Sequence, residues 1–169
     1  LLSSAILRDL LGHHHQTGAT ATLLTAVLPT DAGAYGRVVR GADGQVSAIV
    51  EARDATPEQK ALREINTSVY AFEAGDLFRL LGQIRPNNAQ GELYLTDVVG
   101  LLKQEGKRVE AFVSPDPDVV LGVNTRVELA EIGDIMRRRV LKEWMLSGVS
   151  IPDPSTTYIE ADVTVGQDT

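Results

Sequence analysis

The stretch TATLLTAVL, residues 20–28, decides the fold class of this chain. It is rich in Thr, Val and Leu and lacks clean alternation, a pattern typical of a strand buried on both faces of a sheet. Further strands are predicted at residues 37–40, 45–51, 65–72 and 109–113, and the turn cluster GADG joins the first two of them as a β-hairpin. Helical patterns alternate with the other strands, so we expect an α/β fold with a mixed sheet.

Helix signals lie between and around these strands. We expect helices at residues 3–12, 57–63, 76–84, 97–105 and 126–146. Thr96 is expected to cap the fourth, and the Thr125-x-x-Glu128 spacing predicts a capping box at the fifth. Three consecutive histidines follow Gly12. Neighbouring residues on a helix point about 100° apart, so we interpret the triplet as a solvated helix end rather than a metal site.

The composition limits the classes of function. A chain of 169 residues fits one domain, and its net charge of −7 argues against non-specific binding to nucleic acid. No window approaches the roughly 18 apolar residues that a membrane span needs. The lack of cysteine excludes a disulfide, a thiol nucleophile and Cys-ligated zinc, and it fits a reducing cytosol. The chain opens on leucine without a secretory leader, and we interpret it as a protein entered midway.

A polar string precedes the fourth helix. NNAQGELYLTD, residues 87–97, gathers polar and turn-forming residues in front of an apolar run, and it includes Tyr94 and Thr96. One interpretation is a loop with a helix cap. The other is the wall of a pocket for a polyhydroxylated ligand.

Four more residues are candidates because of their positions. Gly36 starts the hairpin and would leave its N–H open to a ligand, although a turn glycine is the favoured interpretation. Glu51 ends a strand and, as an acceptor-only carboxylate, suits sugar hydroxyls, although such a residue is more often solvated. Asn66 lies within an apolar strand and is either a satisfied core residue or a ligand contact. Asn124 precedes the capping box and offers an oxygen to Mg²⁺, although a plain helix-start Asn is favoured.

Five segments, taken in order, carry a resemblance: YGRVVR, IVEARDAT, EINTSVYAF, NNAQGELYLTDVV and GVNTRVEL. Together they resemble the uridyltransferase domain of the bifunctional bacterial enzyme N-acetylglucosamine-1-phosphate uridyltransferase/glucosamine-1-phosphate acetyltransferase. The resemblance implies a Rossmann-like nucleotidyltransferase (pyrophosphorylase) fold that forms UDP-N-acetylglucosamine from UTP and N-acetylglucosamine 1-phosphate. It also implies that Mg²⁺ is the cofactor, that the full-length protein is a cytoplasmic homotrimer, and that its product feeds peptidoglycan and lipopolysaccharide synthesis. Neither nucleic acid nor a membrane is an expected partner.

The resemblance also assigns residues and domains. Gly36, Glu51, Asn66 and Asn124 match sugar-nucleotide contacts, Asn124 also matches a magnesium ligand, and Tyr94 and Thr96 match residues on the sugar-phosphate side. Residues 1–148 match the C-terminal portion of the uridyltransferase domain. Residues 149–169 match a linker and the first rung of the left-handed β-helix that carries acetyl transfer from acetyl-CoA, although a frayed terminus fits this tail equally well.

The family's glycine-rich nucleotide loop, with its basic residues, and the aspartate that partners Asn124 on magnesium match nothing in these 169 residues. The catalytic residues therefore stay unassigned, and we expect the 169 residues alone to be inactive. A sheet without the family's first strands is also expected to expose an unpaired edge. Two alternatives stay open: another sugar-1-phosphate nucleotidyltransferase, such as one that uses glucose 1-phosphate, or a non-catalytic binding or assembly module.

Overall fold

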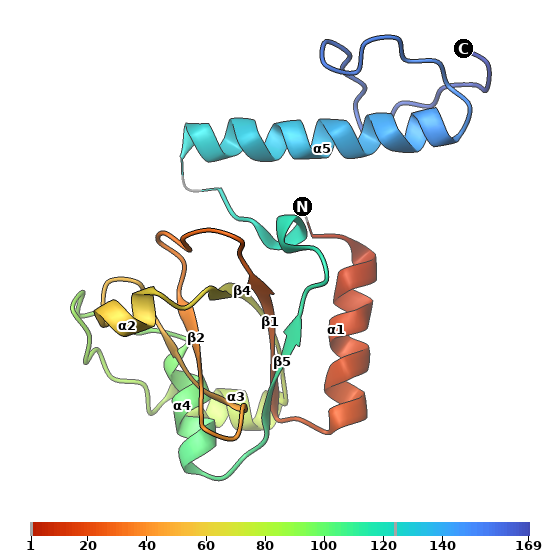
Figure 1. Cartoon of the computed structure of the whole chain (residues 1–169). Helices are drawn as coiled ribbons and strands as arrows, with labels where there is room; N and C mark the ends of the chain where they lie inside the picture. Colours follow the sequence, from red (N-terminus) through yellow and green to blue (C-terminus); the bar gives the residue numbers. More distant parts are fainter. Residues whose placement is uncertain (1, 124) are drawn as a thin grey trace. The chain divides into compact units, whose positions relative to one another are not determined.

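A computed structural model describes residues 2–123 and 125–169 of the protein. These residues form two compact units, Leu2–Val120 and Leu121–Thr169. The first unit holds a sheet and its helices, and the second holds one long helix and the C-terminal tail (Figure 1). The predicted domain change between residues 148 and 149 lies inside the second unit and stays a prediction.

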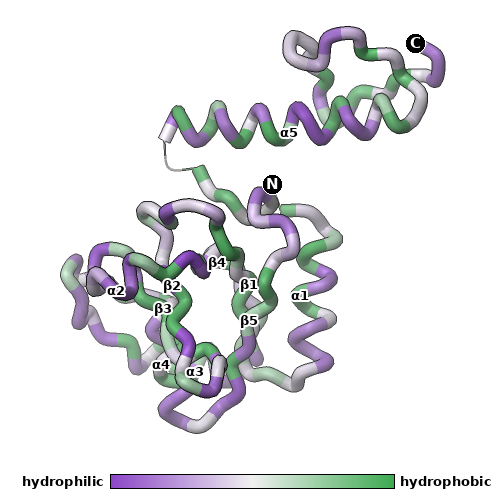
Figure 2. Tube along the Cα trace, in the orientation of Figure 1, coloured by the Kyte–Doolittle hydropathy of each residue, from purple (hydrophilic) through white to green (hydrophobic). Residues whose placement is uncertain are grey.

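The sheet of the first unit has five strands in the order β3-β2-β4-β1-β5, and all five are labelled in Figure 2. Strand β1 pairs parallel with β5 and antiparallel with β4, and β2 pairs antiparallel with β3 and β4. The mixed α/β sheet that the sequence predicts is therefore confirmed. The strands are β1 Ala21–Val27, β2 Arg37–Arg40, β3 Val46–Val50, β4 Glu64–Phe72 and β5 Val109–Val113.

Strand β1 is buried along its length, and only its last residue, Val27, is exposed. Its alternate residues face two different layers. On one face, helix α1 (Ser4–Thr17) lies along β1 and β5 (Figure 1). On the other face, α3 (Ala74–Leu81) and α4 (Asp97–Gln104) build the main core, whose apolar members appear green in Figure 2. This core joins Leu23, Val38, Val46, Ile49, Leu80, Val98, Val99, Leu102 and Val109.

The first helix differs from its prediction. It does not end near Gly12 but continues to Thr17, where Gly18 adopts the left-handed conformation with φ 61° that commonly ends helices. The extension places His14 in the interface with the sheet, where its Nδ1 lies 2.8 Å from Thr22 Oγ1. The prediction of a solvated helix end is wrong for His14, because packing on β1 outweighs the cost of a mid-helix glycine.

The structure has two capping boxes, of which the one at α5 was predicted from the sequence. Thr56 and Gln59 cap the short α2 (Pro57–Lys60), which has proline in its first turn. Thr125 and Glu128 cap α5 (Arg126–Leu146) through bonds of 3.1 and 2.8 Å. A 3₁₀ turn, η1 (Pro117–Val120), ends the first unit.

Residues 149–169 form no helix or strand. Their ends nevertheless meet, because Asp168 N donates to Gly148 O at 3.0 Å and Ser150 N donates to Thr169 O at 3.0 Å. The tail thus forms one closed loop. A β-helix rung in this segment stays a prediction.

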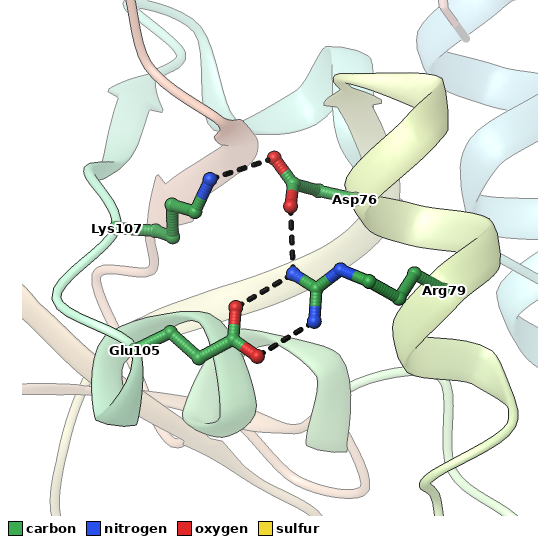
Figure 3. A network of polar contacts seen from close by, with 4 residues as sticks. All are labelled: Asp76, Arg79, Glu105 and Lys107. Atoms are coloured by element: carbon green, nitrogen blue, oxygen red, sulfur yellow. Dashed lines mark hydrogen bonds and ion pairs between the residues drawn. The ribbon is translucent and has the colours of Figure 1, made fainter.

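A polar network ties α3 to the end of α4 (Figure 3). Arg79 donates to both carboxylate oxygens of Glu105, at 2.7 and 2.6 Å, and to Asp76 Oδ1 at 2.7 Å. Lys107 Nζ reaches the other oxygen of Asp76 at 3.2 Å. Hydrogen bonds from Arg79 lower the pKa of both carboxyl groups below their ordinary values. The two helices that carry the core are therefore also linked at the surface.

Candidate functional site

Three of the predicted site residues are brought together by the sheet. Gly36 directly precedes β2 and Glu51 directly follows β3, so the β2–β3 hairpin, which pairs Arg37 with Val50, places them side by side. The β2–β4 ladder begins at the pair Arg37 and Ile65, and Asn66 N donates to Gly36 O at 2.8 Å. Three separate segments thus meet at one point of the sheet.

Gly36 is needed here for close approach. A Cβ atom at this position would lie 3.2 Å from Glu51 Oε2 and 3.5 Å from the Cβ of Asn66. The φ of Gly36 is not positive, so turn geometry does not demand glycine. The Gly36 N–H forms no hydrogen bond with another residue that the structure describes. A backbone donor and a carboxylate acceptor therefore lie next to each other without a side chain between them.

Thr96 adds a fourth segment through Glu51. Its Oγ1 lies 3.2 Å from Glu51 Oε1, and the hydroxyl is 45 residues away from this partner in the sequence. Glu51 is half-buried and bonded, which differs from a freely solvated carboxylate. The expected cap by the Thr96 side chain is wrong: the residue occupies the N-cap position in a right-handed helical conformation and makes no side-chain cap bond. Its hydroxyl binds Glu51 instead.

Asn66 is only 4% exposed, and its surroundings are irregular. Its Oδ1 accepts the N–H of Ser68 at 3.2 Å, and Ser68 has a φ of 61°. Burial raises the pKa of Tyr70, hydrogen bonds from Asn66 and Ser68 act against that rise, and the charge of Glu51 adds to it. Asn66 thus belongs to a polar network beside the Glu51 carboxylate.

Arg37 is a site residue that sequence reasoning missed. It is 1% exposed, and its guanidinium donates to the carbonyl oxygens of Gly33 at 3.1 Å and Lys60 at 3.4 Å. It also donates to the carbonyl oxygen of Tyr35. Asp31 lies 3.7 Å away as an ion partner. The buried guanidinium of Arg37 holds the loop that ends at Gly36. The sequence feature that could have identified this residue is an arginine at an inward-facing position of the YGRVVR strand.

The polar side chains of residues 87–97 mainly form hydrogen bonds within their own loop. Asn88 Oδ1 accepts the N–H groups of Gln90 and Glu92, both at 3.1 Å. Ala89 N donates to Asp54 Oδ1 at 2.8 Å, which fastens the loop to the chain after β3. The Tyr94 hydroxyl accepts from Gln90 Nε2 at 2.6 Å. Hydrogen bonds within the loop therefore account for most of the string, without the expected cap, and Thr96 alone among its residues bonds to Glu51.

A pocket of about 370 Å³ opens beside Thr96. Residues from β3, α4 and the segment after α3 line it, among them Ile49, Gln83 and Gly100. Asp97 also lines it, and burial, followed by the charge of Asp54, raises the pKa of Asp97. Gly36, Glu51 and Asn66 do not line this space. The pocket therefore shares only Thr96 with the predicted cluster.

Asn124, the predicted magnesium ligand, lies outside the described residues. Within residues 2–123 and 125–169, no three His, Cys, Asp or Glu side chains gather in a group that could hold a metal ion. In the same part of the chain, no helix is long and apolar enough to cross a membrane.

Known proteins match this chain over its full length. The bifunctional protein GlmU of Shouchella clausii is 46% identical over 169 residues, which are 100% of this chain and 37% of the relative. The chain is homologous to part of GlmU. GlmU of Pelotomaculum thermopropionicum is 49% identical over 100% of this chain and 37% of its own length. GlmU of Streptomyces avermitilis is 50% identical over 99% of this chain and 35% of its own length.

The chain spans little more than a third of these GlmU relatives. The resemblance drawn from five sequence segments is confirmed by the matches across the chain. No family model matches the sequence.

Proposed function

We propose that the full-length protein that carries this chain forms UDP-N-acetylglucosamine and pyrophosphate from UTP and N-acetylglucosamine 1-phosphate. In this proposal the chain supplies the sugar side of a Rossmann-like nucleotidyltransferase site. The observation that carries the proposal is that four residues from four segments meet: Gly36, Glu51, Asn66 and Thr96. The family resemblance assigns the first three to sugar-nucleotide contacts and Thr96 to the sugar-phosphate side. Homology to GlmU over the whole chain supports it.

The chemistry of the cluster suits an amino sugar. Glu51 offers carboxylate oxygen as an acceptor, and the Gly36 N–H is a donor beside it. Asn66 has its amide oxygen occupied by Ser68, which leaves its NH₂ group as a donor. Sugar hydroxyls donate and accept, and an acetamido group offers one N–H and one carbonyl. A ligand of this class can therefore meet both kinds of group at once.

In this reaction these residues would position the sugar phosphate and would not form covalent bonds with it. An oxygen of the sugar phosphate attacks the α-phosphorus of UTP, a new oxygen–phosphorus bond forms, and the bond to the β-phosphate oxygen breaks as pyrophosphate leaves. Holding the sugar phosphate in line with that bond lowers the entropic part of the barrier. In the resemblance, Asn124 would hold Mg²⁺, which would neutralise charge on the phosphates. Tyr94 and Thr96 would lie on the sugar-phosphate side.

The remaining parts of the proposal concern the full-length protein. Acetylation of glucosamine 1-phosphate with acetyl-CoA, a homotrimer built through a left-handed β-helix, and a cytoplasmic place in precursor supply for peptidoglycan and lipopolysaccharide are what the family resemblance implies. The tail loop closed between Gly148 and Asp168 is the segment from which such a β-helix would continue.

The direct test is pyrophosphate release by the full-length protein with UTP, Mg²⁺ and N-acetylglucosamine 1-phosphate. Turnover with this substrate, at least tenfold above that with glucose 1-phosphate, is the expected result. Equal or better use of glucose 1-phosphate would favour another nucleotidyltransferase, and no turnover with any sugar phosphate would favour a binding module. Calorimetric titration of UDP-N-acetylglucosamine with Mg²⁺ into the 169-residue chain then asks whether the sugar-side cluster binds by itself.

A further inference from the structure

The Gly36 N–H belongs to the peptide unit that joins Tyr35 to Gly36. No cis peptide bond occurs among the described residues, so this unit is trans and planar, and its carbonyl oxygen and its N–H point in nearly opposite directions. The direction of the Tyr35 carbonyl therefore determines the direction of the Gly36 N–H. Since this N–H has no acceptor in the part of the chain that the structure describes, the group that holds the carbonyl decides what the N–H can reach.

The group that holds this carbonyl is the guanidinium of Arg37, whose Nη1 donates to Tyr35 O. Arg37 is 1% exposed, so the carbonyl points toward a buried group. The Gly36 N–H, on the other edge of the same peptide unit, points away from that guanidinium. Gly36 itself lies against the Glu51 carboxylate and the Asn66 side chain. The N–H is therefore offered beside the predicted site residues, on the side away from Arg37.

Three further carbonyl groups hold the guanidinium itself. Its Nη2 donates to Gly33 O at 3.1 Å and to Lys60 O at 3.4 Å, and its Nη1 donates to Ala32 O at 3.5 Å. Two of these residues belong to the loop before β2, whereas Lys60 ends α2. The ion partner Asp31 lies 3.7 Å away with a side chain that is 86% exposed. Backbone carbonyls from two segments, rather than an ion pair, therefore fix where the guanidinium lies.

The peptide unit on the other side of Gly36 is fixed as well. Its carbonyl oxygen accepts the N–H of Asn66 at 2.8 Å, so the peptide units on both sides of Gly36 are held by hydrogen bonds. An unrestrained glycine has more backbone freedom than any other residue, and these two bonds remove that freedom. The N–H is thus held in one direction before a ligand arrives, which lowers the entropic cost of binding.

We propose that Arg37 is a positioning residue that directs the Gly36 N–H at a sugar phosphate bound beside Glu51. It does so by holding the Tyr35 carbonyl, and this inference rests on the proposed function. It accounts for an arginine at an inward position of β2, because an apolar side chain has no donor for that carbonyl. A lysine has a donor but lacks the planar guanidinium that binds carbonyls of the loop and of α2 at the same time. With lysine the peptide unit turns more freely, and the N–H loses its fixed direction.

The test uses Arg37→Lys in the full-length protein, assayed well below the Tm of each variant. Steady-state pyrophosphate release gives kcat and the KM of each substrate, and thermal unfolding gives Tm. Arg37→Lys should raise the KM for N-acetylglucosamine 1-phosphate about 3- to 10-fold, the range for one lost neutral hydrogen bond. The KM for UTP should stay near wild type, because the proposed contact is with the sugar phosphate alone.

Arg40→Lys is the matched control, since it places the same substitution in the same strand. Arg40 donates to both carboxylate oxygens of Glu64 at 2.7 Å and to Gly44 O at 2.8 Å, and none of these bonds reaches the peptide unit before Gly36. Arg40→Lys should lower Tm and leave the KM for the sugar phosphate unchanged. An equal rise of this KM in both variants would show that KM only follows stability, and the inference would be overturned.

A double-mutant cycle with Gly36→Ala asks whether Arg37 acts through Gly36. The methyl group of Gly36→Ala already blocks the approach to the N–H, so adding Arg37→Lys should raise the KM for the sugar phosphate no further. The loss of Tm caused by Arg37→Lys should be the same in both backgrounds. An equal fold-rise of KM in both backgrounds would show that Arg37 acts without Gly36, which excludes the positioning role.

A direct measurement needs no Arg37 variant and decides the question if Arg37→Lys does not fold. Full-length protein that carries isotope-labelled glycine gives one amide NMR resonance that is missing from Gly36→Ala. This resonance should shift when UDP-N-acetylglucosamine and Mg²⁺ are added, because the N–H gains an acceptor. If calorimetry shows that the ligand is bound and the resonance does not move, the N–H does not face the ligand and the inference is wrong.

Failure of the proposed function and failure of this inference give different results. Wild-type protein that releases no pyrophosphate with UTP, Mg²⁺ and N-acetylglucosamine 1-phosphate overturns both. Active wild-type protein, together with a folded Arg37→Lys variant whose KM for the sugar phosphate is unchanged, overturns only the positioning role of Arg37.

Discussion

Gly36 and Glu51 approach each other so closely that a methyl group on Gly36 would lie 3.2 Å from the Glu51 carboxylate. The contact joins the two ends of the β2–β3 hairpin. Since Glu51 also accepts a hydrogen bond from Thr96, the hairpin and the start of α4 meet through one carboxylate. A small change at position 36 should therefore be felt more by ligand binding than by folding.

Gly36→Ala should raise the KM for N-acetylglucosamine 1-phosphate about tenfold or more in the full-length protein, because the added methyl fills the approach to the N–H and pushes the carboxylate aside. The contact is with the end of a flexible side chain, so Tm should fall only slightly. Gly75→Ala in α3 is the control, since no atom lies within 4 Å of the added Cβ and alanine favours the helix. An unchanged KM in Gly36→Ala would contradict the assigned role of Gly36.

Thr96→Val removes the hydroxyl that binds Glu51 and keeps the size of the side chain. We expect about 1 kcal/mol less stability, the usual worth of one hydrogen bond, together with a higher KM for the sugar phosphate. Glu51→Ala should raise the same KM while sparing the core. In a double-mutant cycle the two substitutions should be less than additive, because each removes the same bond. Strict additivity would show that the two side chains act independently.

Arg37→Met should destabilise the protein by about 2 to 4 kcal/mol, because the buried guanidinium and its hydrogen bonds to several backbone carbonyls of a mostly exposed loop are lost. Chemical denaturation measures this change. Arg37→Lys should recover only part of the loss, since a lysine cannot reproduce the planar fork. Arg63→Met offers a control at an exposed arginine that makes one bond, to Pro29 O at 3.1 Å. Equal stability of the two methionine variants would count against a structural role for the buried guanidinium.

The Asp76–Arg79–Glu105 network predicts a pH dependence (Figure 3). The pKa of Asp76 is lowered from 3.8 and that of Glu105 from 4.5, chiefly by hydrogen bonds from Arg79. A lowered folded-state pKa means that the stabilisation is complete above the unfolded values and is lost as pH falls through the folded values. Stability should thus decline below about pH 4.5.

Arg79→Gln should reduce this decline, and high salt should weaken it in the wild type because Arg79 and Glu105 are exposed and Asp76 is partly exposed. Thermal unfolding between about pH 2.5 and pH 7, around the ordinary carboxylate pKa values, measures the effect. Arg138→Gln is a control that leaves the network intact, since Arg138 pairs with Asp134 in α5. An Arg79→Gln variant that loses stability with the same pH profile as the wild type would exclude the network as the cause.

Local sequence patterns were sufficient to predict most helices and strands of this fold. The apolar run of β1, the hairpin turn before Val46 and the Thr-x-x-Glu box of α5 each depend on residues a few positions apart, and each was predicted from sequence. Hydrophobic spacing, helix caps and turns depend on backbone geometry that residues close in sequence determine. The family resemblance likewise needed only the order of short motifs, and it selected the residues that the sheet brings together.

The contacts within the site came only from the tertiary structure. The hydroxyl of Thr96 binds Glu51 instead of capping α4. His14 packs in the interface between α1 and the sheet, and the buried Arg37 binds backbone carbonyls of a loop. Each outcome depends on partners that sequence order does not bring near. A buried polar group must find a hydrogen-bond partner wherever packing offers one, so the sequence by itself determined the elements and the candidates, and the packing of the sheet decided how they pair.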